Sequence, residues 1–151
     1  MVNNIKTSLL KLCFQKVEER QINLQKVFDE LQEALQNETK SSAGDKHETT
    51  RAMLQLEREK LGQQLAEVDN LASTLSKIDV NRVTTQVAFG SVVFTSSTNY
   101  FIAVSLGQLN THKQDFFAIS STTPIGQQLL GKGVGDHIEF RDQVFKITKI
   151  I

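Results

Sequence analysis

The sequence predicts an α+β protein, in which an antiparallel helical hairpin precedes a small β-rich domain. In the first half, apolar residues recur at alternating spacings of four and three, which is typical of helices that pack along one seam. The second half is richer in β-branched and aromatic residues, and it holds the only Tyr and the only Pro. We therefore expect the hairpin at residues 1–80 and the β domain at residues 81–151.

Each predicted helix carries one apolar seam with a single polar member. The members of the first seam are Leu10, Phe14, Val17, Gln21, Leu24, Phe28, Leu31 and Leu35. Those of the second are Leu54, Arg58, Leu61, Leu65, Val68, Ala72 and Leu75. Residues 41–44, Ser-Ser-Ala-Gly, are weak helix formers and allow the chain to reverse. Two seams joined by a short break favour an antiparallel coiled-coil hairpin over a parallel dimer, so we expect a monomer.

The second half predicts an antiparallel sheet with one short helix. We expect strands within 83–94, 100–106 and 116–119, and a polar loop over 107–114. Thr123-Pro124-Ile125 predicts the start of a helix that runs to Leu130, because Pro is favoured in the first helical turn. The glycines at 131, 133 and 135 end that helix. Alternating apolar residues over 136–141 and 143–150 predict a closing hairpin.

Composition limits the classes of function. The 17 basic and 17 acidic side chains give zero net charge, which argues against a protein held to nucleic acid mainly by phosphate contacts, although local patches are compatible with it. The single cysteine, Cys13, lies in an apolar helical pattern, so we interpret it as a small buried hydrophobe in a reducing compartment. No apolar run approaches the ~20 residues that span a bilayer. We expect a cytoplasmic protein with no membrane contact.

Few residues suggest chemistry that the chain performs alone. The histidines at 47, 112 and 137 include no pair at zinc-ligand spacing, and His137 is expected to point outward from a strand. The glycine-rich segment 131–135 follows a helix instead of preceding one, so it is interpreted as a turn and not a phosphate loop. No nucleophile–base pair stands out. We expect no enzyme and no intrinsic cofactor.

Two acids at the hairpin reversal are the candidate site. Asp45 and Glu48 are three residues apart, so a helix beginning near Gly44 places both carboxylates on one face. Oxygen ligands at an exposed position suit a hard divalent ion such as Mg²⁺. Alternatively, Asp45 is an N-cap and Glu48 is its capping-box partner, which requires no metal. Both interpretations fit the residues.

Several segments of the second half match a family pattern. They are Val-Ala-Phe-Gly-Ser-Val-Val from Val87, Ile119-Ser120, and Thr-Pro-Ile-Gly-Gln-Gln-Leu-Leu-Gly-Lys-Gly-Val-Gly-Asp-His-Ile-Glu-Phe from Thr123. This half resembles the C-terminal domain of the Gre-type transcript-cleavage factors. The resemblance implies an FKBP-like domain after a coiled-coil hairpin. That fold does not imply prolyl isomerase activity, because function lies in the site.

The resemblance implies a transcription elongation regulator that binds RNA polymerase. The tip pattern of the family is Gly-Asp-Leu-x-Glu-Asn, and this chain has Gly-Asp-Lys-His-Glu-Thr from Gly44. The hairpin would enter the secondary channel and approach the RNA 3′ end. Asp45 and Glu48 would there help hold Mg²⁺ shared with the polymerase, assisting its own cleavage of backtracked RNA. Thr123, Pro124 and Ile125 would dock on the polymerase; alternatively, Pro124 and Ile125 only start and pack the short helix.

The tip also departs from the family pattern. Lys46 stands in place of the family Leu, and Thr49-Thr50-Arg51-Ala52 replaces Asn-Ala-Glu-Tyr. Added positive charge opposes binding of a cation, so the hairpin of a Gre-like regulator could occupy the channel without promoting cleavage. An alternative of another class is a coiled-coil interaction or chaperone-like module with no role at the polymerase.

Overall fold

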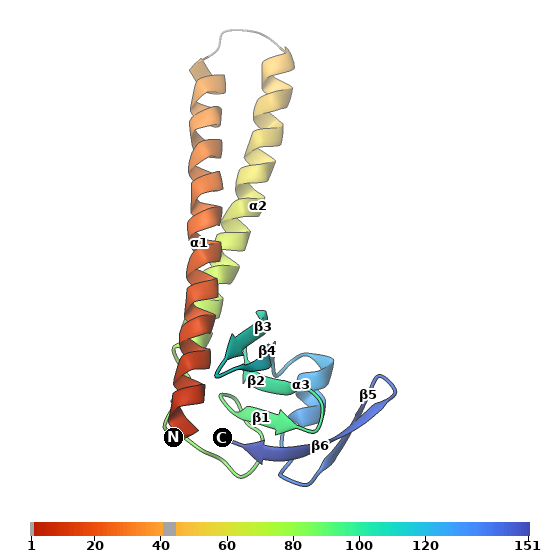
Figure 1. Cartoon of the computed structure of the whole chain (residues 1–151). Helices are drawn as coiled ribbons and strands as arrows, with labels where there is room; N and C mark the ends of the chain where they lie inside the picture. The colour runs from red at the N-terminus through yellow and green to blue at the C-terminus, as the bar shows by residue number, and fades with distance from the viewer. Residues whose placement is uncertain (1, 41–44) are drawn as a thin grey trace. The chain divides into compact units, whose positions relative to one another are not determined.

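The computed structural model describes residues 2–40 and 45–151, with side chains at 4–38 and 48–151. Two long helices come first, α1 (Val2–Lys40) and α2 (Asp45–Leu75). They are followed by β1 (Val92–Thr95), β2 (Asn99–Ala103), β3 (Gly107–Thr111), β4 (Gln114–Ser120), α3 (Pro124–Leu129), β5 (His137–Phe140) and β6 (Gln143–Ile150). Figure 1 shows these elements, and the α+β class is confirmed. Among the described helices, none is both long and apolar enough to cross a bilayer.

The chain divides into two compact units. The unit that we call the sheet unit contains Met1–Lys16 and Ser73–Ile151, and the unit that we call the arm contains Val17–Ala72. Both long helices contribute residues to each unit. The sheet unit thus includes residues 1–16 and 73–80 in addition to the predicted 81–151. The helical segments of this unit carry fully buried side chains.

The six strands form one mixed sheet in the order β3-β4-β2-β1-β6-β5. Strands β2 and β4 are parallel, with Asn99 beside Phe116 and Ala103 beside Ser120, while the other neighbours are antiparallel. The prediction of a wholly antiparallel sheet was therefore wrong at this pair. Strand β3 does not pair with β2. Strand β4 forms a hairpin with β3 and lies between β3 and β2 in the sheet.

Two other predicted boundaries were wrong. Residues 107–111, predicted as loop, form edge strand β3, in which Leu109 is the one buried side chain. The strand expected from residue 83 begins only at Val92, because Ser91 N–H donates to the Ala88 carbonyl oxygen in a turn and Gly90 has φ +90°. Within the predicted strand, the residues before this turn form an isolated bridge, between Gln86 and Gly133.

The face of the sheet toward α3 carries the main apolar cluster. Its buried members come from β1, β2, α3, β5, β6 and the segment before β1; they are Val87, Val93, Ile102, Leu129, Ile138, Phe145 and Ile147. The predicted helix and closing hairpin that supply most of these side chains are confirmed. The glycine-rich segment forms the turns between α3 and β5, where Gly133 N–H donates to Asp136 Oδ2 at 2.8 Å, as interpreted from the sequence.

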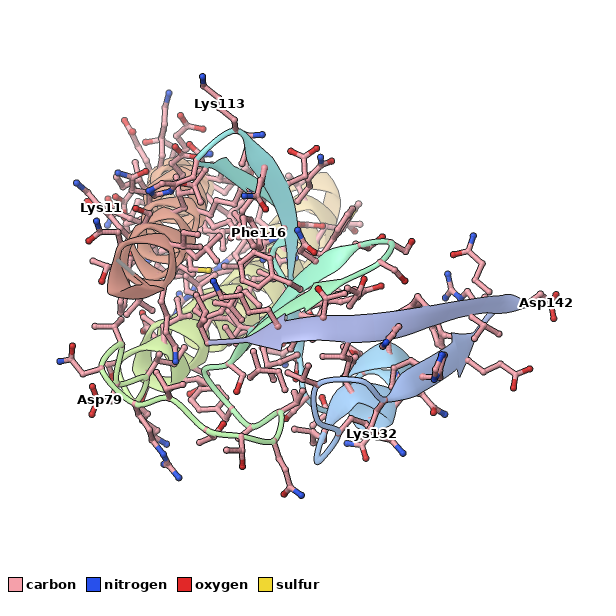
Figure 2. The ribbon with its side chains drawn as sticks, turned by 60° about the horizontal axis from the view of Figure 1, so that its bottom comes forward. Lys11, Asp79, Lys113, Phe116, Lys132 and Asp142 are labelled. Atoms are coloured by element: carbon pink, nitrogen blue, oxygen red, sulfur yellow. The ribbon has the colours of Figure 1, made fainter. Side chains whose placement is uncertain are left out.

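The opposite face carries Phe101 and Phe116, both with no exposed surface. Figure 2 shows Phe116 on the side of the sheet toward the helices. In the same unit, Leu9, Cys13 and Leu75 from α1 and α2 are also fully buried. The sheet unit is therefore layered, with α3 on one face of the sheet and the helical segments 2–16 and 73–75 on the other.

At the start of α1, the buried residues differ from those of the predicted seam. Phe14, expected on the seam, is 37% exposed, and Leu10 is half-buried, whereas Leu9 and Cys13 take the fully buried positions. Here α1 packs in the sheet unit, so a different stripe faces inward. Burial raises the pKa of the Cys13 thiol to about 12, so at neutral pH the thiol is protonated and apolar in character, as predicted.

Lys16 covers one edge of the sheet. Its ammonium donates to the carbonyl oxygens of Leu106 at 3.3 Å and Gln108 at 2.9 Å, at the start of edge strand β3. An edge strand presents backbone groups that can pair with another chain, and a lysine placed there opposes such pairing. The lysine thus also ties α1 to the outermost strand.

Candidate functional site

The arm is built from two antiparallel helical segments, as Figure 1 shows. Its buried described side chains all occupy predicted seam positions: Val17, Leu35, Leu61 and Val68. The polar seam residue Gln21 donates from Nε2 to Asp69 Oδ1 at 3.3 Å, which joins α1 to α2. The segment from Val17 to Lys40 rises about 36 Å at about 1.5 Å per residue. The arm is thus long and buries one stripe of each helix.

The two predicted acids belong to the first turn of α2. Helix α1 ends at Lys40 and α2 begins at Asp45, and the reversal predicted at residues 41–44 lies outside the described residues. Asp45 and Glu48 are three residues apart in this helix, which places both positions on one face. Glu48 is exposed, and the side chain of Asp45, the other member of the predicted capping box, lies outside the described residues.

The chemistry of this pair suits a shared metal ion and not a complete site. Two carboxylates supply oxygen ligands of the type Mg²⁺ prefers, but Mg²⁺ requires six ligands, so water or another molecule must supply the rest. Within the described part of the chain, no group of three or more His, Cys, Asp or Glu side chains is arranged to hold a metal. Arg51, also exposed, is three residues beyond Glu48 and lies on the same face of α2.

The predicted docking residues lie at the start of α3 and differ in exposure. Thr123 is the N-cap: its hydroxyl accepts from Gly126 N–H at 3.2 Å and donates to the Ser120 carbonyl oxygen at 2.7 Å. Ile125 is half-buried against the main apolar cluster. Pro124, in the first turn, is exposed. Two of the three side chains therefore start and pack the helix, and Pro124 is left facing solvent.

Gly126 is a positioning residue that sequence reasoning missed. A Cβ built on Gly126 would clash with the Ser120 carbonyl oxygen and lie 3.0 Å from Ser121 Cα. The close approach lets α3 begin directly over the loop that leaves β4. The signal available in the sequence was a glycine at the third position after an N-cap threonine, in a helix that otherwise avoids Gly.

The tip acids and the start of α3 are thus both present on described helices. Neither a protein-family model nor a curated protein matches the chain.

Proposed function

We propose that the chain is a transcription elongation regulator that binds RNA polymerase and inserts its hairpin into the secondary channel. The observation that carries the proposal is the arm, a two-helix unit with two acidic positions in the first turn of α2. In this proposal the arm is a coiled-coil hairpin, and the sheet unit is an FKBP-like domain. The motifs from Val87 to Phe140 support the same function.

Each part of the chain has a role in this proposal. Glu48 is exposed and Asp45 shares its helical face, so the two carboxylates can bind a cation that a second molecule also coordinates. Mg²⁺ held in this way would activate water for in-line attack on the backtracked RNA. The exposed Pro124, positioned by Thr123 and Ile125, would contact the polymerase. In this role the chain assists the polymerase's own cleavage and supplies only part of the metal site.

A second candidate is a regulator that occupies the same channel without promoting cleavage. Arg51 favours it, because a guanidinium on the same face as Glu48 opposes binding of a second cation. Lys46 and His47 lie between the two acids in the sequence and add to this effect. The two candidates share the partner and the channel but differ in the chemical outcome.

A cleavage assay separates these candidates. Backtracked elongation complexes from the same organism would be incubated with the protein and Mg²⁺, and release of short 3′ RNA fragments would be timed. We expect Asp45→Ala and Glu48→Ala each to slow stimulated cleavage by about 10- to 100-fold, since changing even outer-shell groups of a metal site costs this much.

The matched control is Glu59→Ala, which removes an exposed carboxylate from the same helix, away from its first turn. It should leave cleavage unchanged. Arg51→Gln should accelerate cleavage if Mg²⁺ is held at the tip. Binding to the polymerase without any stimulation, in both the parent chain and Arg51→Gln, would instead identify the non-cleaving regulator.

A further inference from the structure

A small cavity in the sheet unit gathers positive charge. It has a volume of about 180 Å³ and lies between the start of α1 and the segment joining α2 to β1. Three cationic side chains line it, Lys6, Lys77 and Arg82, together with the carboxylate of Asp79 and the ring of Phe89. Figure 2 labels Asp79 on this connecting segment. None of these residues belongs to the arm or to α3.

Lys6 is an unusual residue to find at this depth. Its side chain is 3% exposed, and its ammonium donates to the Arg82 carbonyl oxygen at 2.6 Å. An ammonium carries three N–H donors, and this bond uses one of them. Burial lowers the pKa of Lys6; the Asp79 carboxylate opposes this shift and Arg82 adds to it. The charge of Lys6 is thus incompletely compensated.

Asp79 offsets only part of the positive charge of the cavity, because it is one carboxylate among three cationic side chains. Its Oδ1 accepts from Asn81 N–H at 2.9 Å, and the Asp79 side chain is exposed to solvent. Lys77 and Arg82 are exposed as well and line the cavity. One acid therefore faces three cations, and the cavity keeps a positive potential.

The two hydroxyls that line the cavity are used within the loop. Thr84 Oγ1 donates to the Gln86 carbonyl oxygen at 2.6 Å, and Ser91 Oγ accepts from Ala88 N–H at 3.0 Å. These bonds fix the loop that presents Phe89, whose ring is 39% exposed. A ligand would therefore meet cationic donors and the aromatic side chain of Phe89.

We propose that this cavity binds the phosphate of a small phosphate monoester with a planar organic group, the chemistry of a nucleoside monophosphate. The phosphate would bind Lys6, Lys77 and Arg82, since charge-assisted bonds to phosphate are the strong ones. The planar group would stack on Phe89. The volume lies below the roughly 300–1,000 Å³ of sites that enclose drug-sized ligands, so the cavity would hold the phosphate end. This inference does not depend on the proposed role in transcription.

Isothermal titration of the full chain with adenosine monophosphate, inorganic phosphate and adenosine, at constant ionic strength, tests the inference. We expect the monophosphate to bind, phosphate to bind more weakly, and adenosine not to bind. Lys77→Gln and Arg82→Gln should each weaken binding about tenfold, the loss expected for one charge-assisted hydrogen bond. Phe89→Ala should weaken binding of the monophosphate and leave that of phosphate unchanged.

The controls make each outcome decisive. Lys11→Gln removes an exposed charge from α1 and should not affect binding. Lys6→Met should abolish it, and if that variant fails to fold, the surface variants of Lys77 and Arg82 decide alone. No binding of either phosphate compound at concentrations on the order of millimolar would overturn the inference. It would also be overturned if Lys11→Gln weakened binding as much as Arg82→Gln does, because only diffuse charge attraction would then be involved.

Discussion

Replacing Gly126 with Ala is expected to destabilise the protein by about 3 kcal/mol or more, because the new methyl group overpacks a site walled by backbone. The Cβ would clash with the Ser120 carbonyl oxygen. That oxygen accepts from the hydroxyl of Thr123 at 2.7 Å and from its N–H at 3.2 Å. It cannot move away without breaking the cap of α3. Denaturant unfolding of the parent and variant chains measures the difference.

The matched control for this prediction is Gly62→Ala in the interior of α2. A Cβ at Gly62 meets no atom within 4 Å, and Ala is favoured over Gly in the interior of a helix. We expect this variant to gain about 0.5–1 kcal/mol of stability in the arm. If Gly126→Ala changed the free energy of unfolding by no more than Gly62→Ala does, the packing described for the start of α3 would be contradicted.

Replacing Phe116 with Ala is expected to cost about 3–5 kcal/mol of unfolding free energy, since it empties a large site in the core. Phe116 has no exposed surface, and its ring meets that of Phe94 edge-to-face with centroids 5.6 Å apart. The cavity would open on the face of the sheet toward the helices. The same denaturant titration, followed by far-ultraviolet circular dichroism, measures the loss.

The adjacent Phe117 provides the control, because it lies on the same strand but points to the other face. It is 37% exposed, so Phe117→Ala should cost only about 1–2 kcal/mol, from the smaller apolar area removed from contact. Equal losses at the two positions would show that the helical layer over Phe116 is not formed in solution.

Local signals in the sequence predicted the elements with strong patterns. The two long helices, the helix start at Thr123-Pro124-Ile125 and the closing hairpin all depend on neighbours a few residues away. Strand β3 was missed because Leu109 is its only buried side chain, and a polar edge strand has the composition of a loop. The parallel pairing of β2 and β4 depends on contacts distant in the sequence, which no local pattern encodes.

For the candidate site, the sequence predicted positions along a helix and not side-chain contacts. Spacing alone placed Asp45 and Glu48 in one helical turn, since both fall at the start of α2. Docking at Thr123, Pro124 and Ile125 stays a prediction; the structure adds that Thr123 caps α3, Ile125 packs against the apolar cluster and Pro124 is exposed. Lys6 was missed because a lysine near the start of a helix is usually solvated, and its burial arises from the segment after α2.

Site-specific crosslinking tests the central claim most directly. A photoreactive amino acid would replace Thr49, which is exposed one residue beyond Glu48, and the full chain would be irradiated with RNA polymerase from the same organism. The proposed function predicts a crosslink to polymerase residues that line the secondary channel, and its loss in a Pro124→Arg variant. No crosslink to any polymerase subunit, together with no co-migration of chain and polymerase in gel filtration, would contradict the proposed function.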